Sequence, residues 1–177
     1  MPSNFTIRPA LPSDAPGVSA LAISSWHDVY ANSVSEQATE VATTTTFSED
    51  SMRKDLESPN HITLIAEGGP SGKDVVGLSI LKSGVSTPGV SMPSAIKLGR
   101  FYVHSSLHGS GLAQRLLEET EQTVKDTGEH EGSWLHVWSE NGRAVRFWEK
   151  EGFKRVGEES WVVGDSQLEL ITMEKAL

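Results

Sequence analysis

The sequence predicts a single α/β (α+β) domain with a mixed, mostly antiparallel sheet of about six to seven strands and helices on both faces. Three observations predict it. The expected elements run strand, helices, three strands, helix, strand, helix and two strands, unlike the strict alternation of a doubly wound sheet. The 177 residues, 37% hydrophobic and 22% charged, suffice for one globular core. No internal repeat or long linker divides the chain, so residues 1–177 are expected to form one domain.

The first third of the chain predicts a strand followed by helices. Residues 5–8 are expected to form a short strand. A helix should begin near Asp14, a candidate N-cap, and run to about Tyr30. Residues 31–46 are polar and rich in threonine, and their pattern fits either a short helix or an irregular loop. Residues 48–57 predict another helix with Ser48 as its candidate cap.

The remaining elements alternate between apolar runs and segments rich in turn residues. Three strands are expected at 61–67, 75–82 and 95–103, joined by a Gly- and Pro-containing turn at 68–73 and a surface loop at 83–94. An amphipathic helix should follow and stop at Gly128. The expected elements after it are a strand at 134–138, a helix at 141–150 and strands at 153–157 and 167–173.

The junction between the third of these strands and the long helix predicts an anion-binding site. Gly109 and Gly111 lie where the loop turns into the helix. The first N–H groups of a helix have no partner within it, and the helix dipole favours an anion beside them. Glycine lacks the Cβ that would hold a phosphate away. A tight strand-to-helix turn without a ligand is the alternative that this motif alone leaves open.

Composition excludes several classes of function. A net charge of −9 and a pI of about 5.1 argue against a nucleic-acid partner, which needs a basic surface. The absence of cysteine excludes disulfides and thiolate metal ligands. His104 and His108 have no third ligand near them in sequence, so no metal site is expected. No apolar run is long enough for a membrane span and no secretory signal is evident, so we expect no membrane partner and a cytoplasmic location.

Two blocks of residues resemble the GNAT superfamily of acyl-CoA-dependent N-acetyltransferases. The first is Tyr102-Val103 followed by residues 108–113, in which Gly111 and Ala113 match the small positions of the family's acyl-CoA signature and His108 replaces its Gln or Arg. The second resembles the family's downstream block and comprises Asn141, Ala144, Phe147-Trp148 and Gly152-Phe153. Loose matches at 7–10, 26–30 and 170–173 extend the resemblance over nearly the whole chain.

The resemblance implies a fold and a site for acetyl-CoA as co-substrate. The strands at 98–103 and 134–138 should splay apart and admit the pantetheine arm, with the pyrophosphate on backbone N–H groups. Asn141 would hydrogen-bond the arm, and Ala144 and Trp148 would line its thiol end. Arg115 and Arg143 are candidate phosphate contacts, with solvated helix arginines as the alternative. The implied cofactor-binding residues are Phe101, Tyr102, Val103, His108, Gly109, Ser110, Gly111, Leu112, Ala113, Asn141, Ala144 and Trp148.

The implied reaction is direct attack of a primary amine of a small molecule on the thioester. The family's usual acid is a tyrosine at the position of Trp148, whose indole cannot donate a useful proton. The catalytic candidates that remain are Tyr102, Tyr30 and His136.

Three matters stay open at the level of sequence. The acceptor could instead be a protein or peptide amine, and the missing tyrosine leaves room for a non-catalytic CoA-binding regulatory domain. The acidic composition would suit a cationic acceptor. Homodimers are common in the family, but no residue here marks an interface.

Overall fold

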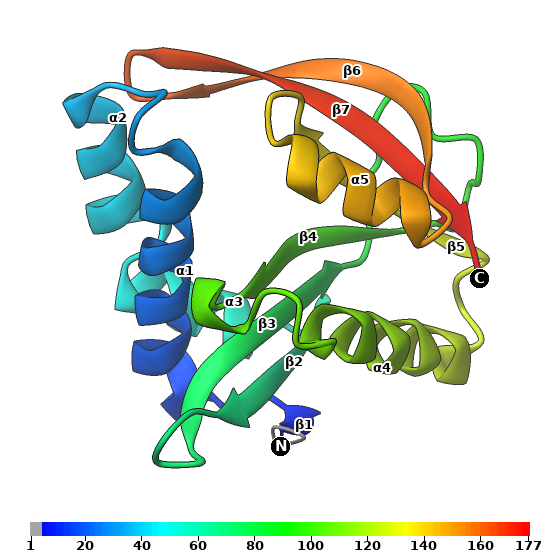
Figure 1. Cartoon of the computed structure of the whole chain (residues 1–177). Helices are drawn as coiled ribbons and strands as arrows, with labels where there is room; N and C mark the ends of the chain where they lie inside the picture. Colours follow the sequence, from blue (N-terminus) through cyan, green and yellow to red (C-terminus); the bar gives the residue numbers. More distant parts are fainter. Residues whose placement is uncertain (1–4) are drawn as a thin grey trace.

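Seven strands form one mixed sheet in the computed structural model, which describes residues 5–177 (Figure 1). The sheet order is β1-β2-β3-β4-β5-β7-β6, and all neighbours are antiparallel except β4 and β5. This confirms the predicted mixed, mostly antiparallel sheet. The strands are β1 (Thr6–Pro9), β2 (His61–Gly68), β3 (Asp74–Lys82), β4 (Ile96–Val103), β5 (Gly132–Trp138), β6 (Lys154–Val163) and β7 (Ser166–Ala176).

Helices cover both faces of the sheet (Figure 1). On one face α1 (Ala15–Tyr30), α2 (Glu36–Val41) and α3 (Glu49–Glu57) pack on a core that contains Trp26, Leu78 and Ile80. On the other, α4 (Leu112–Thr127) and α5 (Gly142–Lys150) pack on a core that contains Leu135 and Met173. We call these the α1 face and the α5 face. Within residues 5–177, no helix combines the length and apolar character that a membrane crossing requires.

The parallel strands β4 and β5 pair only where they begin. Ile96 lies opposite Ser133 and Lys97 opposite Trp134, and beyond these pairs the strands diverge. The opposite edge of β4 stays paired with β3 as far as Val103. The edge of β4 from residue 98 onward therefore faces an opening in the sheet, as the resemblance implied.

A β-bulge in β4 decides which side chains face which side of this opening. Leu98 pairs with Leu81 and Arg100 with Ile80, so Gly99 is an extra residue. The extra residue shifts the in–out alternation by one step. Leu98 and Phe101 consequently pack in the core of the α5 face, whereas Tyr102 packs on the α1 face. Arg100 joins Tyr102 there, with its guanidinium 5.0 Å from the ring centre of Phe47.

Two local predictions about helices can be compared with the structure. Ser48 caps α3 as expected, because its hydroxyl accepts a hydrogen bond from the N–H of Ser51. Asp14 precedes α1, but the expectation that its side chain caps the helix was wrong. Its carboxylate instead accepts from the N–H of Leu11 and pairs with Arg8 at 2.9 Å.

Two segments differ from, or go beyond, what the sequence predicted. Residues 31–46, which the sequence left undecided, contain α2 and one turn of π-helix at Ala42–Thr46. The strands expected at 153–157 and 167–173 were too short, since β6 and β7 form one long hairpin that turns at Gly164. Most of β6 is exposed, as an edge strand beside β7 alone, which explains why its apolar pattern is weak.

Candidate active site

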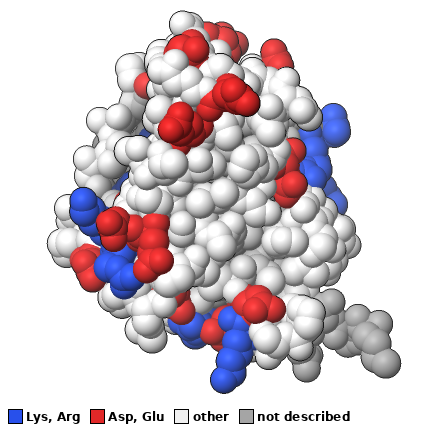
Figure 2. All heavy atoms as spheres, turned by 90° about the vertical axis from the view of Figure 1, so that its left-hand side faces the viewer, with Lys and Arg blue, Asp and Glu red and all other residues white. Residues whose placement is uncertain are grey.

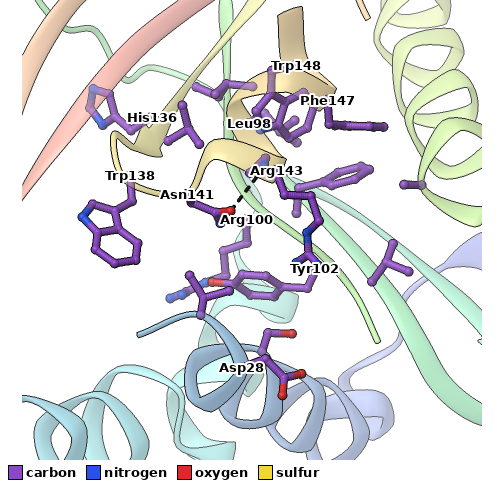
Figure 3. A pocket seen from close by; sticks show the side chains of 18 of the residues that line it. Asp28, Leu98, Arg100, Tyr102, His136, Trp138, Asn141, Arg143, Phe147 and Trp148 are labelled. Atoms are coloured by element: carbon purple, nitrogen blue, oxygen red, sulfur yellow. Dashed lines mark hydrogen bonds between the residues drawn. The ribbon is translucent and has the colours of Figure 1, made fainter. Parts of the chain in front are cut away.

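A cavity of about 720 Å³ lies at the opening between β4 and β5 and is lined from both faces of the sheet. Figure 3 shows Phe147 and Trp148 on one side of it, and Tyr102 on the side of Asp28 from α1. A molecule that occupied the cavity could therefore reach through the sheet. The two sides differ in chemistry and are described in turn.

The glycines of the loop before α4 adopt a backbone conformation that other residues avoid. Gly109 has φ of 82° and Gly111 has φ of 85°, both in the left-handed region. A Cβ at either position would meet no atom within 4 Å. Glycine is therefore required here by backbone geometry, and the space beside the loop is open.

Some backbone amides of this loop are already paired and others are not. The N–H of Ser110 donates to the carbonyl of Leu107 at 3.1 Å, and that of Leu112 reaches the Ser110 hydroxyl at 3.3 Å. Within residues 5–177 we find no acceptor for the N–H groups of Gly109, Gly111, Ala113 and Gln114. Unpaired N–H groups at the start of a sixteen-residue helix form a suitable site for an anion.

His108 links this loop to α5 and to the edge of β4. Arg143 can only donate, so its contact at 2.5 Å makes Nδ1 of His108 an acceptor. Nε2 then carries the hydrogen and donates to the carbonyl of Val103 at 3.1 Å. Burial and the charge of Arg143 both lower the pKa of His108. A neutral His108 thus stands where the family signature has Gln or Arg.

The α5 face of the cavity ends in a polar cap and an aromatic wall. The side-chain oxygen of Asn141 accepts from the N–H of Ala144 at 3.2 Å, which caps α5 and leaves the amide NH₂ free to donate. Trp148 packs against Phe101 and Phe153 with ring centres 5.1 and 5.2 Å away. This apolar wall provides contact area but no acid for a leaving group.

Aromatic rings form the far wall of the cavity on the α1 face. The ring centres of Trp26 and Tyr30 lie 4.5 Å apart, and those of Tyr30 and Trp138 lie 5.0 Å apart. Trp161 packs edge-on against Trp26 with ring centres 5.9 Å apart. Burial, with a smaller effect of Tyr102, raises the pKa of Tyr30. Tyr30 therefore stays protonated and is a poor base.

His136 projects from β5 into the α1 face of the same cavity (Figure 3). Its Nε2 is buried 2.9 Å from a carboxylate oxygen of Glu159, at an angle that does not make a hydrogen bond. Burial and then Lys97 lower the pKa of His136, and Glu159 opposes them only in part. Within residues 5–177 we find no partner for its Nδ1, so a neutral imidazole can accept a proton there, and Glu159 would stabilise the resulting cation.

The comparisons with known proteins agree with this arrangement. Residues 30–177 match the family model described as the acetyltransferase (GNAT) domain. The chain belongs to the GNAT acetyltransferase family. It is thus an acyl-CoA-dependent N-acetyltransferase whose acetyl donor is acetyl-CoA.

Solved structures share this GNAT fold over nearly the full length of the chain. PaiA N-acetyltransferase from Thermoplasma acidophilum, crystallised with coenzyme A, is 21% identical with a TM-score of 0.76, over 98% of this chain and 99% of that one. NAA60 from Arabidopsis thaliana, in complex with a bisubstrate analogue, is 14% identical with a TM-score of 0.72, over 98% and 99%. The ribosomal-protein-S18-alanine N-acetyltransferase from Escherichia coli is 16% identical with a TM-score of 0.69, over 98% and 94%. These identities establish the fold alone.

The GNAT site expected from sequence can now be placed. The predicted residues that line the cavity are Tyr30, Phe101, Tyr102, Val103, His108, Gly109, Gly111, Ala113, His136, Asn141, Ala144 and Trp148. Two others do not line it. Ser110 donates its hydroxyl to the carbonyl of Leu107, and Leu112 is fully buried in the core.

Several cavity residues were not found from the sequence. Trp161 lies on the part of β6 that the apolar pattern did not predict, and Glu159, which contacts His136 but does not line the cavity, belongs to the same segment. Trp26 on α1 and Phe47 in the turn before α3 resemble ordinary core residues, since a buried aromatic side chain gives no separate sign of a cavity. The available signal was that three cavity tryptophans, Trp26, Trp138 and Trp148, fall in segments to which the resemblance extends.

Proposed function

We propose that this GNAT domain transfers the acetyl group of acetyl-CoA to a primary amine of a small molecule, by direct attack of the amine. The observation that carries the proposal is the cavity at the β4–β5 opening. It has a loop suited to an anion on one face, and on the other the aromatic half of the cavity on the α1 face, which we call the chamber. Donor and acceptor can meet there without a covalent enzyme intermediate. Holding two reactants in such an arrangement is worth an effective molarity of roughly 10⁵ M or more.

The donor fits the α5 face through backbone groups. The unpaired N–H groups of Gly109, Gly111 and Ala113 suit the pyrophosphate, and the open edge of β4 suits the amides of the pantetheine arm. The carbonyl of Val103 already accepts from His108, so the arm would bond mainly to other groups of this edge. Arg143 can leave His108 for a phosphate oxygen, because charge favours that contact.

On the α1 face, His136 is the group best suited to accept the proton of the amine. An alkyl amine has a pKa near 10, so only about one molecule in a thousand is neutral at pH 7. His136 is neutral at that pH and has Glu159 behind it. The ammonium first loses one proton to solvent; the neutral amine nitrogen then forms a bond to the acetyl carbon, the carbon–sulfur bond breaks, and the second amine proton passes to His136. The sulfur leaves as thiolate and takes its proton from water or from Tyr102, which lines the same chamber.

A contact between α2 and the turn of the β6–β7 hairpin favours a small acceptor over a polypeptide. The backbone N–H of Ser35, just before α2, donates to the Ser166 hydroxyl at 3.1 Å, and the Ser35 hydroxyl donates to Asp165. A Cβ on Gly164 would lie only 2.9 Å from the Cα of Ala38. The turn of the β6–β7 hairpin is therefore seated on α2, as Figure 1 shows at the upper left. An extended peptide cannot pass between these two elements while they remain in contact.

Release of free thiol from acetyl-CoA tests the proposal. A panel should contain small primary amines of several classes and peptides with free N-termini, with calorimetry to measure acetyl-CoA binding separately. We expect binding in the absence of acceptor, and turnover with small amines. Turnover with peptides alone would overturn the choice of a small acceptor. Failure to bind acetyl-CoA would overturn the function itself.

A further inference from the structure

We infer that the acceptor amine also carries an anionic group of the carboxylate class, which Lys97 and Arg100 bind on the α1 face of the cavity. The inference rests on the proposed function and specifies its substrate. It reverses the expectation from net charge, which suggested a cationic acceptor. Its basis is the charge of the chamber itself.

The cavity has the opposite sign of charge from the whole chain. The chain carries a net charge of −9, and Figure 2 shows acidic and basic groups in small clusters on one outer face, separated by uncharged surface. The ionic side chains that line the cavity are Lys97, Arg100, Arg143 and a single carboxylate, Asp28. Arg143 belongs to the α5 face, where it contacts His108. Lys97 and Arg100 remain for the acceptor.

Arg100 faces the cavity, where it pairs with Asp55 and lies beside the Tyr102 hydroxyl. Its Nε donates to Asp55 at 3.1 Å, and the guanidinium lies over the ring of Phe47, which fixes its plane. The side chain is only 15% exposed. The Tyr102 hydroxyl also interacts with the guanidinium, and within residues 5–177 no carboxylate other than that of Asp55 pairs with it. A buried guanidinium that lines the cavity and has one carboxylate partner is suited to bind a planar carboxylate beside the Tyr102 hydroxyl.

Lys97 has no carboxylate in direct contact, although the charge of Glu159 acts on it from further away. Its ammonium lies 4.9 Å from the ring centre of Trp134, and none of the residues that the structure describes places a carboxylate within 4.0 Å of it. Burial lowers the pKa of Lys97. Because a half-buried ammonium is costly to leave unpaired, a ligand carboxylate would bind there favourably. The bulge at Gly99 brings Lys97 and Arg100 to the same face of β4.

The remaining walls indicate what else the acceptor contains. Trp26, Tyr30, Trp138 and Trp161 line the chamber and present ring faces and edges. An apolar or aromatic body would bury its surface against them. A second positive charge on the acceptor would instead meet Lys97 and Arg100. The substrate class is therefore an amino acid or related amino carboxylate with an apolar body.

Matched acceptor pairs test the inference. Phenylalanine is compared with phenethylamine, and amino carboxylates with two to five carbons between their charges are compared with the corresponding alkyl amines. The quantity measured is the ratio of kcat/KM within each pair, for wild type and Lys97→Met. Comparing this ratio between proteins cancels the intrinsic reactivity of each amine. Lys97→Arg restores the charge, and Lys73→Met removes an exposed charge outside the cavity lining.

We expect wild type to favour the carboxylate member, and the ratio to fall about 10- to 100-fold in Lys97→Met, as loss of a charge-assisted hydrogen bond would produce. It should recover in Lys97→Arg and stay unchanged in Lys73→Met. Preference of wild type for the plain amines, or an unchanged ratio in Lys97→Met, would overturn the inference while leaving acetyl transfer intact.

A second measurement needs neither turnover nor a variant. Calorimetry should show that 3-phenylpropanoate binds wild type at least tenfold more tightly than 3-phenylpropanamide does. Equal binding of the two would also overturn the inference. Thiol release with none of the amines would, by contrast, refute the proposed function.

Discussion

Asp55 stabilises two cations behind the acceptor chamber, and removing its charge should destabilise the protein strongly. Its carboxylate lies 3.2 Å from Nζ of Lys82 and 3.1 Å from Nε of Arg100. The Asp55 side chain is 14% exposed and that of Arg100 is 15% exposed. Loss of one partner from a buried ion pair costs about 3–5 kcal/mol, because the other charge stays buried. Asp55→Asn keeps an oxygen that can accept from Arg100, so we expect ~2–3 kcal/mol.

Thermal unfolding measures this cost. For a chain of this size each 1 kcal/mol shifts Tm by about 2–4 °C, so Asp55→Asn should lower it by roughly 4–12 °C. Glu49→Gln is the matched control, since it breaks the exposed pair between Glu49 and Arg53 at 2.7 Å. Exposed pairs contribute about 0–1 kcal/mol. If Asp55→Asn melted as close to wild type as Glu49→Gln does, the account of a buried ionic cluster would be refuted.

The same variant has a defined pH dependence. Burial alone would raise the pKa of Asp55, but Arg100 and Lys82 outweigh it and the net shift is downward. A carboxylate with a depressed folded-state pKa contributes stability above its unfolded-state pKa and loses that contribution as the pH falls. The difference in stability between wild type and Asp55→Asn should therefore be complete at neutral pH and shrink below about pH 4.

Three further predictions concern the site. His136→Gln should lower kcat about 10²- to 10⁴-fold without changing the acetyl-CoA affinity measured by calorimetry, and an unaltered kcat would exclude His136 as the base. In wild type, kcat/KM should fall on the acid side below pH 6.5, because burial and Lys97 lower the pKa of His136. Gly111 and Gly72 have φ of 85° and 69°, so Gly111→Ala and Gly72→Ala should each lower the free energy of unfolding by about 1–2 kcal/mol in chemical denaturation. Only Gly111→Ala should weaken CoA binding, and equal CoA affinities of the two variants would contradict the anion site. In an NMR titration His108 should have a pKa below 6.5, and this pKa should rise in Arg143→Met because the guanidinium disfavours protonation of the imidazole. A lower pKa of His108 in Arg143→Met would contradict the assigned contact.

The parts of the fold that the sequence predicted are those with local causes. Ser48 caps α3 from within the same turn, and the glycines before α4 adopt positive φ for reasons contained in the loop. By contrast, most of β6 is exposed and pairs with β7 alone, so its alternation carries little signal. The contact of Ser35 with the β6–β7 turn joins residues 130 or more apart, and no local pattern encodes it.

The acceptor side of the site shows most clearly why a pattern within one strand is not enough. Regular alternation along β4 would put Lys97 and Arg100 on opposite faces, since they are three residues apart. They share a face because Gly99 is left unpaired, and that depends on the register with β3, about twenty residues upstream. The same register determines where positive charge gathers in a chain whose sum of charges is −9. Net charge describes the field that a ligand meets as it diffuses toward the protein. The choice of acceptor depends instead on Lys97 and Arg100, which the bulge places on the cavity side of β4.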